Sequence, residues 1–235
     1  TLRSRGLGDV YKRQEERGKM IALFFLIVIS TVFWSMFEQS GGSMTLFADR
    51  ATDLTRFGME LTAAQFGSAN AIFIILLSPF FALMWPALLS NNIEPSTPAK
   101  FGLGIVQVGL GFGALLIGLN NPDSAGLVSA WWLVLAYFLH TSAELCLSPI
   151  GLSAVTKLSI ARYVGVMMGA WFLASAYGSY LASELAIFFS SIGGEDGRLD
   201  NSGFNALFTE LLMYGVGVGI ACLLYTSDAA DEVSW

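Results

Sequence analysis

The sequence predicts an all-α membrane protein built as a bundle of six transmembrane helices. Of its 235 residues, 54% are hydrophobic and only 13% are charged, a composition typical of a protein solvated by lipid. No segment shows the alternation of apolar and polar residues over about 10 positions that a membrane β-barrel requires. Six windows carry at most one charge, and each is long enough for a helix of about 20 residues to cross about 30 Å of hydrocarbon. These windows are 20–48, 61–93, 101–122, 124–156, 163–194 and 201–221.

The two ends of the chain do not continue the pattern of the segments beside them. The strings "DVYKRQ" (residues 9–14) and "CLLYTSDAADE" (222–232) resemble opposite-strand translations of one sequencing adapter. We therefore expect residues 1–14 and 222–235 to be artefacts without packing against the bundle, and residues 15–221 to be the native part of a longer protein. The sixth helix is then truncated. The alternative is a native basic arm and a native acidic tail.

Charge and cysteine content exclude several classes of partner. The formal net charge of −6 does not change without the two terminal strings, because they carry equal numbers of acidic and basic residues. A nucleic-acid partner would need a basic face, so we expect none. Cys146 is the only cysteine of the native part, which leaves no disulfide and no thiolate metal site. We expect neither a metal nor another cofactor.

Lysine and arginine in the short connections predict the orientation in the membrane. Five of them fall on one side, namely Arg17, Lys19, Lys100, Lys157 and Arg162. Three fall on the other side, namely Arg50, Arg56 and Arg198. The bias places both native ends in the cytoplasm. Most acidic loop residues then lie outside, among them Asp49, Asp123 and Asp196.

Two further patterns bear on how the helices pack. Small residues recur every four positions in the fifth window, at Ala170, Ala174, Gly178 and Ala182, and Gly109 and Gly113 repeat the pattern in the third. Such stripes let helix backbones approach closely in lipid. Prolines stand in or beside two of the windows, where we expect kinks or helix ends. They are Pro79, Pro86 and Pro149.

Glu144 is a lone carboxylate far from both ends of its apolar window. Such a group costs about 2.5 to 3.5 kcal/mol at the centre of a transmembrane helix, so it must face a partner or a polar cavity. Ser148 lies four residues on and shares its helix face. Pro149 and Gly151 follow and would free backbone groups nearby. This segment predicts a polar and deformable site; the alternative is a protonated carboxyl without function.

Other spans carry polar or aromatic residues that would suit the same cavity. In "TVFWSMFEQSGGSM", Trp34 and Glu38 are four residues apart, with Gln39 beside them. Asn70 brings an amide into the second window, and Trp171 brings an indole into the fifth. An aromatic wall beside a carboxylate suits an amine. Each residue also has a simpler interpretation, as packing for the tryptophans and as an interhelical hydrogen bond for Asn70.

These stretches resemble a known family. "FWSMFEQSGGSMTLFADR", "QFGSANAIFIILLSPFFALMW", "SAELCLSPIGLSAVTKLS" and "MMGAWFLASAYGSYLA" are similar to the carboxyl-terminal half of bacterial proton-dependent oligopeptide transporters, in the major facilitator superfamily. The string E-L-x-L-S-P-x-G-L-S is its most specific part. The resemblance covers nearly all of residues 15–221. It implies a proton-coupled symporter that imports di- and tripeptides by alternating access through the bacterial inner (plasma) membrane.

The resemblance also implies roles for single residues. Glu144 matches the glutamate that receives the peptide amino group, and Asn70 matches an amide that helps to hold the peptide. Glu38 matches a carboxylate that takes part in proton coupling by pairing with a cation of the amino-terminal half. Three residues match cavity-lining positions: Trp34, Ser148 and Trp171. The implied partners are short peptides, protons, the lipid bilayer and the missing amino-terminal half.

The chain departs from the family pattern in two respects. Ala71 stands where the family often has proline, which would straighten the helix and shift the Asn70 amide. The amino-terminal half, with its E-x-x-E-R-type signature and its cations for the peptide carboxylate, is missing. This part of the protein should not transport alone.

Functions other than peptide transport have weaker support in the sequence. An intramembrane hydrolase would need a nucleophile and a base, but His140 is the only histidine, and "GLSAV" lacks the second glycine of a nucleophile elbow. We therefore expect no enzyme, and expect His140 to be a packing or interhelical residue. A major facilitator relative that moves another small solute and a non-transporting membrane receptor stay open as alternatives.

Overall fold

The computed structural model describes residues 2–55, 61–190 and 201–232. Within them, six helical segments are long and apolar enough to cross a membrane, as predicted: Arg13–Ala51, Ala63–Ser90, Thr97–Leu119, Ala130–Leu158, Ala161–Phe189 and Asn201–Leu224. Arg56, Asp196 and Arg198 of the orientation prediction lie outside the described residues. The chain is thus a multi-pass membrane protein.

The first span is not one continuous helix. It consists of α1 (Leu2–Phe37), the short 3-10 helix η1 (Glu38–Gly41) and α2 (Ser43–Ala51). The break coincides with the pair Gly41–Gly42. The other five spans contain α3 (Ala63–Ser90), α4 (Thr97–Leu119), α5 (Ala130–Leu158), η2 (Ala161–Tyr163) with α6 (Val164–Ser190), and α7 (Asn201–Glu232).

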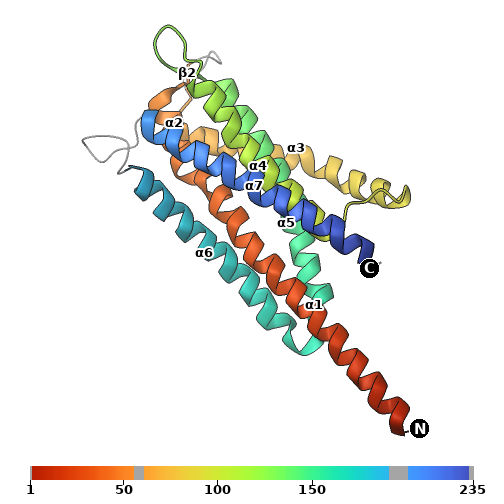
Figure 1. The fold of residues 1–235 in the computed structure, drawn as a ribbon. Coiled ribbons are helices and arrows are strands. Elements are labelled where there is room, and N and C mark those ends of the chain that lie inside the picture. Colours follow the sequence, from red (N-terminus) through yellow and green to blue (C-terminus); the bar gives the residue numbers. More distant parts are fainter. Residues whose placement is uncertain (1, 56–60, 191–200, 233–235) are drawn as a thin grey trace.

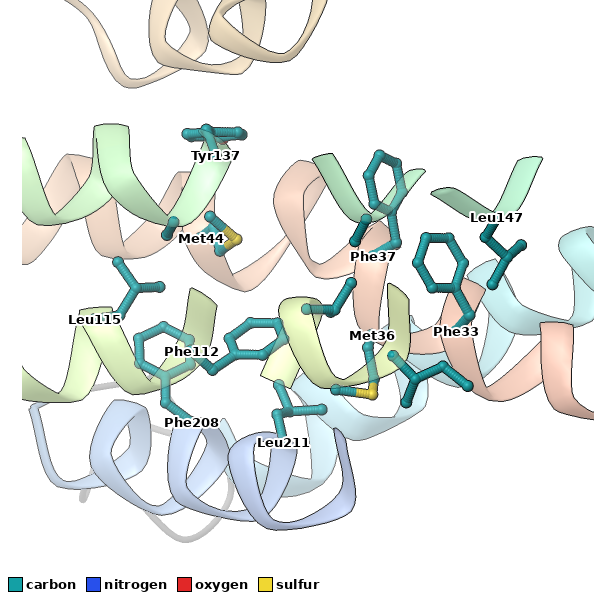
Figure 2. Packing of buried hydrophobic residues seen from close by; sticks show 14 of the residues in the cluster. Phe33, Met36, Phe37, Met44, Phe112, Leu115, Tyr137, Leu147, Phe208 and Leu211 are labelled. Carbon is teal, nitrogen blue, oxygen red and sulfur yellow. The ribbon is translucent and has the colours of Figure 1, made fainter. Parts of the chain in front are cut away.

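The helices pack as two groups that share a core (Figure 1). Helix α4 lies between α5 and α7, α6 runs beside α1, and α3 contacts mainly α5. Figure 2 shows buried side chains of α1, α4, α5 and α7 meeting in this core, with Phe33, Phe112 and Phe208 among the fully enclosed ones. The core positions α5, and hence Glu144, against both α1 and α3.

Glycines set the closest helix contacts. A Cβ added at Gly178 of α6 would lie 2.5 Å from Cβ of Trp34 and 3.0 Å from the backbone nitrogen of Ser35 in α1. A Cβ added at Gly109 of α4 would lie 3.0 Å from Cα of Gly215 in α7. Both predicted stripes of small residues therefore form close helix pairs, as small residues do in lipid.

The prolines do not end their helices. Helix α3 continues through Pro79 and Pro86, and α5 continues through Pro149. Neighbouring helices in a membrane bundle can satisfy the backbone groups that a proline frees. Helix α3 begins with a capping box, in which Thr62 and Gln65 satisfy each other's backbone amides.

Two short strands tie together connections at one end of the bundle. β1 (Thr52–Asp53) pairs in parallel with β2 (Val128–Ser129). This link joins the end of α2 to the start of α5, and Figure 1 places it at the end opposite to the amino terminus.

The two terminal strings continue the first and the last helix of the chain. Helix α1 begins at Leu2, and α7 runs on to Glu232. Cys222 is 5% exposed, and its Cβ would lie 3.2 Å from a Cβ added at Gly102 of α4. The first residues of the second string thus pack on the bundle, in contrast to our expectation, because their apolar character prolongs α7.

Candidate substrate site

An amide and a carboxylate meet between α3 and α5. Nδ2 of Asn70 donates to Oε2 of Glu144 at 3.1 Å and to Oγ1 of Thr141 at 3.1 Å. Asn70 and Glu144 are each half-buried, whereas Thr141 is fully buried. Two residues that the sequence singled out separately are therefore brought together, and they form a hydrogen-bonded pair across two transmembrane helices.

Glu38 is the first residue of the break between α1 and α2. Its side chain is half-buried, and it lies close enough to Glu144 for the two carboxylates to repel each other. Two carboxylates near each other in a membrane favour a cation as their partner. Because α1 ends at Phe37, the predicted helix face shared by Trp34 and Glu38 is interrupted at Glu38 itself.

The helix break is held by hydrogen bonds to its neighbours. Nε2 of Gln39 donates to the carbonyl of Ala182 in α6 at 3.0 Å, and Ser43 donates to Oε1 of Gln39 at 2.7 Å. The hydroxyl of Tyr137 in α5 donates to the carbonyl of Ser40 at 3.2 Å. The break is thus fixed between α5 and α6, where it positions Glu38.

The two tryptophans lie in packed surroundings. Trp34 is half-buried between α1 and α6, and its ring packs edge-on against Phe33 and Phe37, with centroids 5.3 Å and 5.5 Å away. Trp171 is only 3% exposed, so close over Gly151 of α5 that a Cβ there would lie 2.0 Å from its ring. In this conformation Trp171 contacts protein on all sides and does not reach Asn70 or Glu144 through any described hydrogen bond.

Ser148 and His140 flank Glu144 on α5. Ser148 is half-buried one turn after the carboxylate. His140 is fully buried one turn before it, with Nε2 3.1 Å from the carbonyl of Val108 and the ring against Phe112, centroids 4.8 Å apart. This agrees with the interhelical role expected for His140.

Sequence reasoning missed three polar residues in the bundle. Thr141 accepts from Asn70, and Ser142 donates to Oε1 of Gln107 in α4 at 2.7 Å. Gln107 also contacts Sγ of Cys146 at 3.9 Å. The position of Thr141, three residues before Glu144, was the available signal, because residues three apart in a helix lie side by side.

A membrane bundle of six described spans, with a carboxylate–amide pair between two of them and a broken first span, is typical of a membrane transporter. The chain belongs to the POT family, whose sequence model matches residues 7–199. The predicted fold class, the carboxyl-terminal half of a major facilitator bundle, is confirmed, and the matches below are to transporters and not to an enzyme family.

Most of the similar proteins are peptide transporters by name. "Peptide transporter YePEPT" of Yersinia enterocolitica is 42% identical over 171 residues, which are 72% of this chain and 34% of that protein. "Dipeptide and tripeptide permease A" of Chromobacterium violaceum is 39% identical, over 73% of this chain and 34% of that protein. A crystal structure of "peptide transporter POT in complex with sulfate" superposes with a TM-score of 0.80 at 36% identity. The superposition covers 91% of this chain and 41% of the transporter chain in that crystal structure.

The chain spans about a third of the length of the curated relatives it matches. The family match begins at residue 7, inside the segment 1–14 that we expected to be an artefact, and ends before α7.

Proposed function

We propose that the chain is the carboxyl-terminal half of a proton-coupled symporter that imports di- and tripeptides through a bacterial inner (plasma) membrane. The observation that carries the proposal is the hydrogen bond from Asn70 to Glu144 across α3 and α5. A carboxylate in a membrane bundle marks a substrate or ion pathway. The peptide-transporter names of the relatives support peptides as the substrate.

Glu144 and Asn70 hold the amino end of the peptide. An ammonium group can pair with the Glu144 carboxylate, and the amide of Asn70 keeps that carboxylate in place. Ser148 lines the site one turn along α5. Trp34 and Trp171 wall the cavity for peptide side chains when α6 and its neighbours change packing during alternating access, since both rings lie at helix contacts.

Glu38 is the proton-linked group. Burial favours the neutral form of a carboxyl, whereas a nearby cation favours the charged form, so making and breaking an ion pair moves a proton. Glu38 stands at a helix break and is half-buried, which supports such a switch. Its cation would come from the amino-terminal half, so the working protein needs that half, protons and a lipid bilayer, and no nucleic acid.

The test uses the full-length protein, recovered from the DNA that encodes this chain and reconstituted in vesicles. Glu144→Gln keeps the shape of the side chain but removes its charge. It should weaken binding of a free dipeptide by about 1.5 to 3 kcal/mol, the range for a charged hydrogen bond. Binding of the acetylated dipeptide should change little. Equal binding of the free dipeptide by both proteins would contradict the anchor role.

Glu38→Gln should separate proton coupling from binding. Counterflow of peptide, which needs no net proton movement, should persist, while accumulation driven by a pH gradient should fall close to background. Accumulation at the unmutated level would refute the coupling role. The unmutated protein also tests the function: transport of another solute only, or binding without uptake, would favour the alternatives of a different substrate or a receptor.

A further inference from the structure

Both hydrogens of the Asn70 amide group are engaged. One is directed to Oε2 of Glu144 and the other to Oγ1 of Thr141, each at 3.1 Å. A side-chain amide has two donors on its nitrogen and one acceptor oxygen, and its hydrogen bonds decide which way it faces. With the nitrogen held by these two acceptors, Oδ1 is the atom that Asn70 can offer to a third group.

Thr141 is fixed as an acceptor toward Asn70. Its hydroxyl donates its only proton to the carbonyl of Tyr137 at 2.8 Å, one turn back on α5. Only lone pairs remain on Oγ1, so a partner at that oxygen must be a donor. Thr141 is also fully buried, so its hydroxyl is shielded from water. The amide oxygen of Asn70 would find no donor at this place, and the flipped amide is disfavoured.

We propose that Thr141 is a specificity-determining positioning residue, which holds the Asn70 amide with its nitrogen turned inward, so that Asn70 presents its amide oxygen, beside the Glu144 carboxylate, to a substrate ammonium. The inference rests on the proposed function and deepens it. Glu144 and Glu38 alone would attract a cation, but a flipped Asn70 would present N–H donors beside them. Thr141 and the Glu144 carboxylate both accept from the amide nitrogen, so Thr141 adds to Glu144 in disfavouring that state, and it thereby favours a primary amine with several N–H donors over a blocked amine.

The experiment measures one ratio, the affinity for dialanine divided by the affinity for N-acetyl-dialanine. It is measured on the reconstituted full-length protein. The ratio does not depend on the amount of folded protein, since both affinities come from the same sample. Thr141→Val keeps the shape and removes the acceptor, and it should lower the ratio about tenfold, as expected for one hydrogen bond. Thr141→Ser keeps the hydroxyl and should restore the ratio.

Thr31→Val is the matched control. Thr31 of α1 makes the same kind of bond to the carbonyl four residues back, at 3.3 Å from Ile27, and lies on a helix other than α3 and α5. It should leave the ratio unchanged. If Thr141→Val does not fold, Thr141→Ala is used in its place, because it removes the same oxygen.

The outcomes separate the two proposals. An unchanged ratio in Thr141→Val, or an equal loss of both affinities, overturns the role of Thr141 and leaves peptide transport standing. Failure of the unmutated protein to bind dialanine overturns the proposed function and the inference together.

Discussion

Gly178 determines how closely α6 approaches α1. The space for its Cβ is occupied by the side chain of Trp34 and by backbone atoms of Ser35 and Thr31. Backbone atoms cannot move aside without shifting the helix, so even a methyl group must separate the pair. The stripe around Gly178 is thus a requirement of the fold and not only a compositional tendency.

Gly178→Ala should destabilise the protein by about 1 to 3 kcal/mol through overpacking. Gly169→Ala on the same helix is the matched control, since a Cβ there meets nothing within 4 Å. That control should gain up to about 1 kcal/mol from helix propensity. Thermal unfolding in detergent gives both values. Equal midpoints for the two variants would contradict the close contact between α1 and α6.

Single residues differ in how far sequence could place them. Asn70 and Glu144 were singled out because polar groups in lipid need a partner, but only the structure shows that they pair with each other. Thr141 and Gln107 escaped notice because neither carries a charge, and a threonine hydroxyl in a helix often bonds only to the carbonyl one turn back. Trp171 was expected to line a cavity but is enclosed, because its position depends on the rotation of α6 relative to Gly151, which no sequence spacing determines.

At the scale of an element, the carboxyl end of α3 is held by contacts with a lysine of α4. None of its most apolar window is buried within the described structure, and its main contact is with α5. Near its carboxyl end, Nζ of Lys100 lies 4.5 Å from the ring centre of Trp85 and forms a salt bridge with Glu94. Lys100 is buried, so this cluster is shielded from water and anchors the end of α3 to the start of α4.

Lys100→Met should loosen that end of α3. Loss of the cation over Trp85 removes about 0.5 to 2 kcal/mol, which raises hydrogen exchange about 2- to 30-fold. The effect should be confined to the last turns of α3 and the following connection. Lys157→Met is the control, because Lys157 is an exposed lysine at the end of α5. Exchange that rises equally in both variants would show that charge alone, and not the cluster, is responsible.

The break in the first span and the order of helix contacts are two features that the sequence does not predict. The sequence predicts one uninterrupted window over residues 20–48, whereas the structure ends α1 at Phe37 and begins α2 at Ser43, directly after Gly41–Gly42. The sequence does not predict which helices contact each other either. Helices that are apolar on nearly all sides carry little information about which face meets which neighbour, so pairing such as α4 with α7 emerges only from packing.

At the scale of the molecule, the bundle has two chemically different ends. One end carries the β1–β2 link and the turn in which Oδ1 of Asp123 accepts from the amides of Ala125 and Leu127, both at 2.9 Å. The opposite end carries the α5–α6 connection with Lys157 and Arg162 (Figure 1). The positive-inside rule therefore predicts that the β1–β2 end faces out of the cell.

Cysteine labelling with a membrane-impermeant reagent tests this orientation in intact cells, and the structure decides which positions to use. Position 100 is unsuitable, because Lys100 is buried and a cysteine there would be shielded from reagent on either side. Asp123 is unsuitable as well, because its carboxylate holds its own turn.

Ser124 and Lys157 are both exposed and serve instead. Ser124→Cys should react with reagent added outside, whereas Lys157→Cys should react only after the cells are opened. The unmutated protein is the control, and its buried Cys146 should stay unlabelled. Labelling of Lys157→Cys in intact cells, with Ser124→Cys protected, would reverse the orientation and with it the assignment of both ends of the bundle.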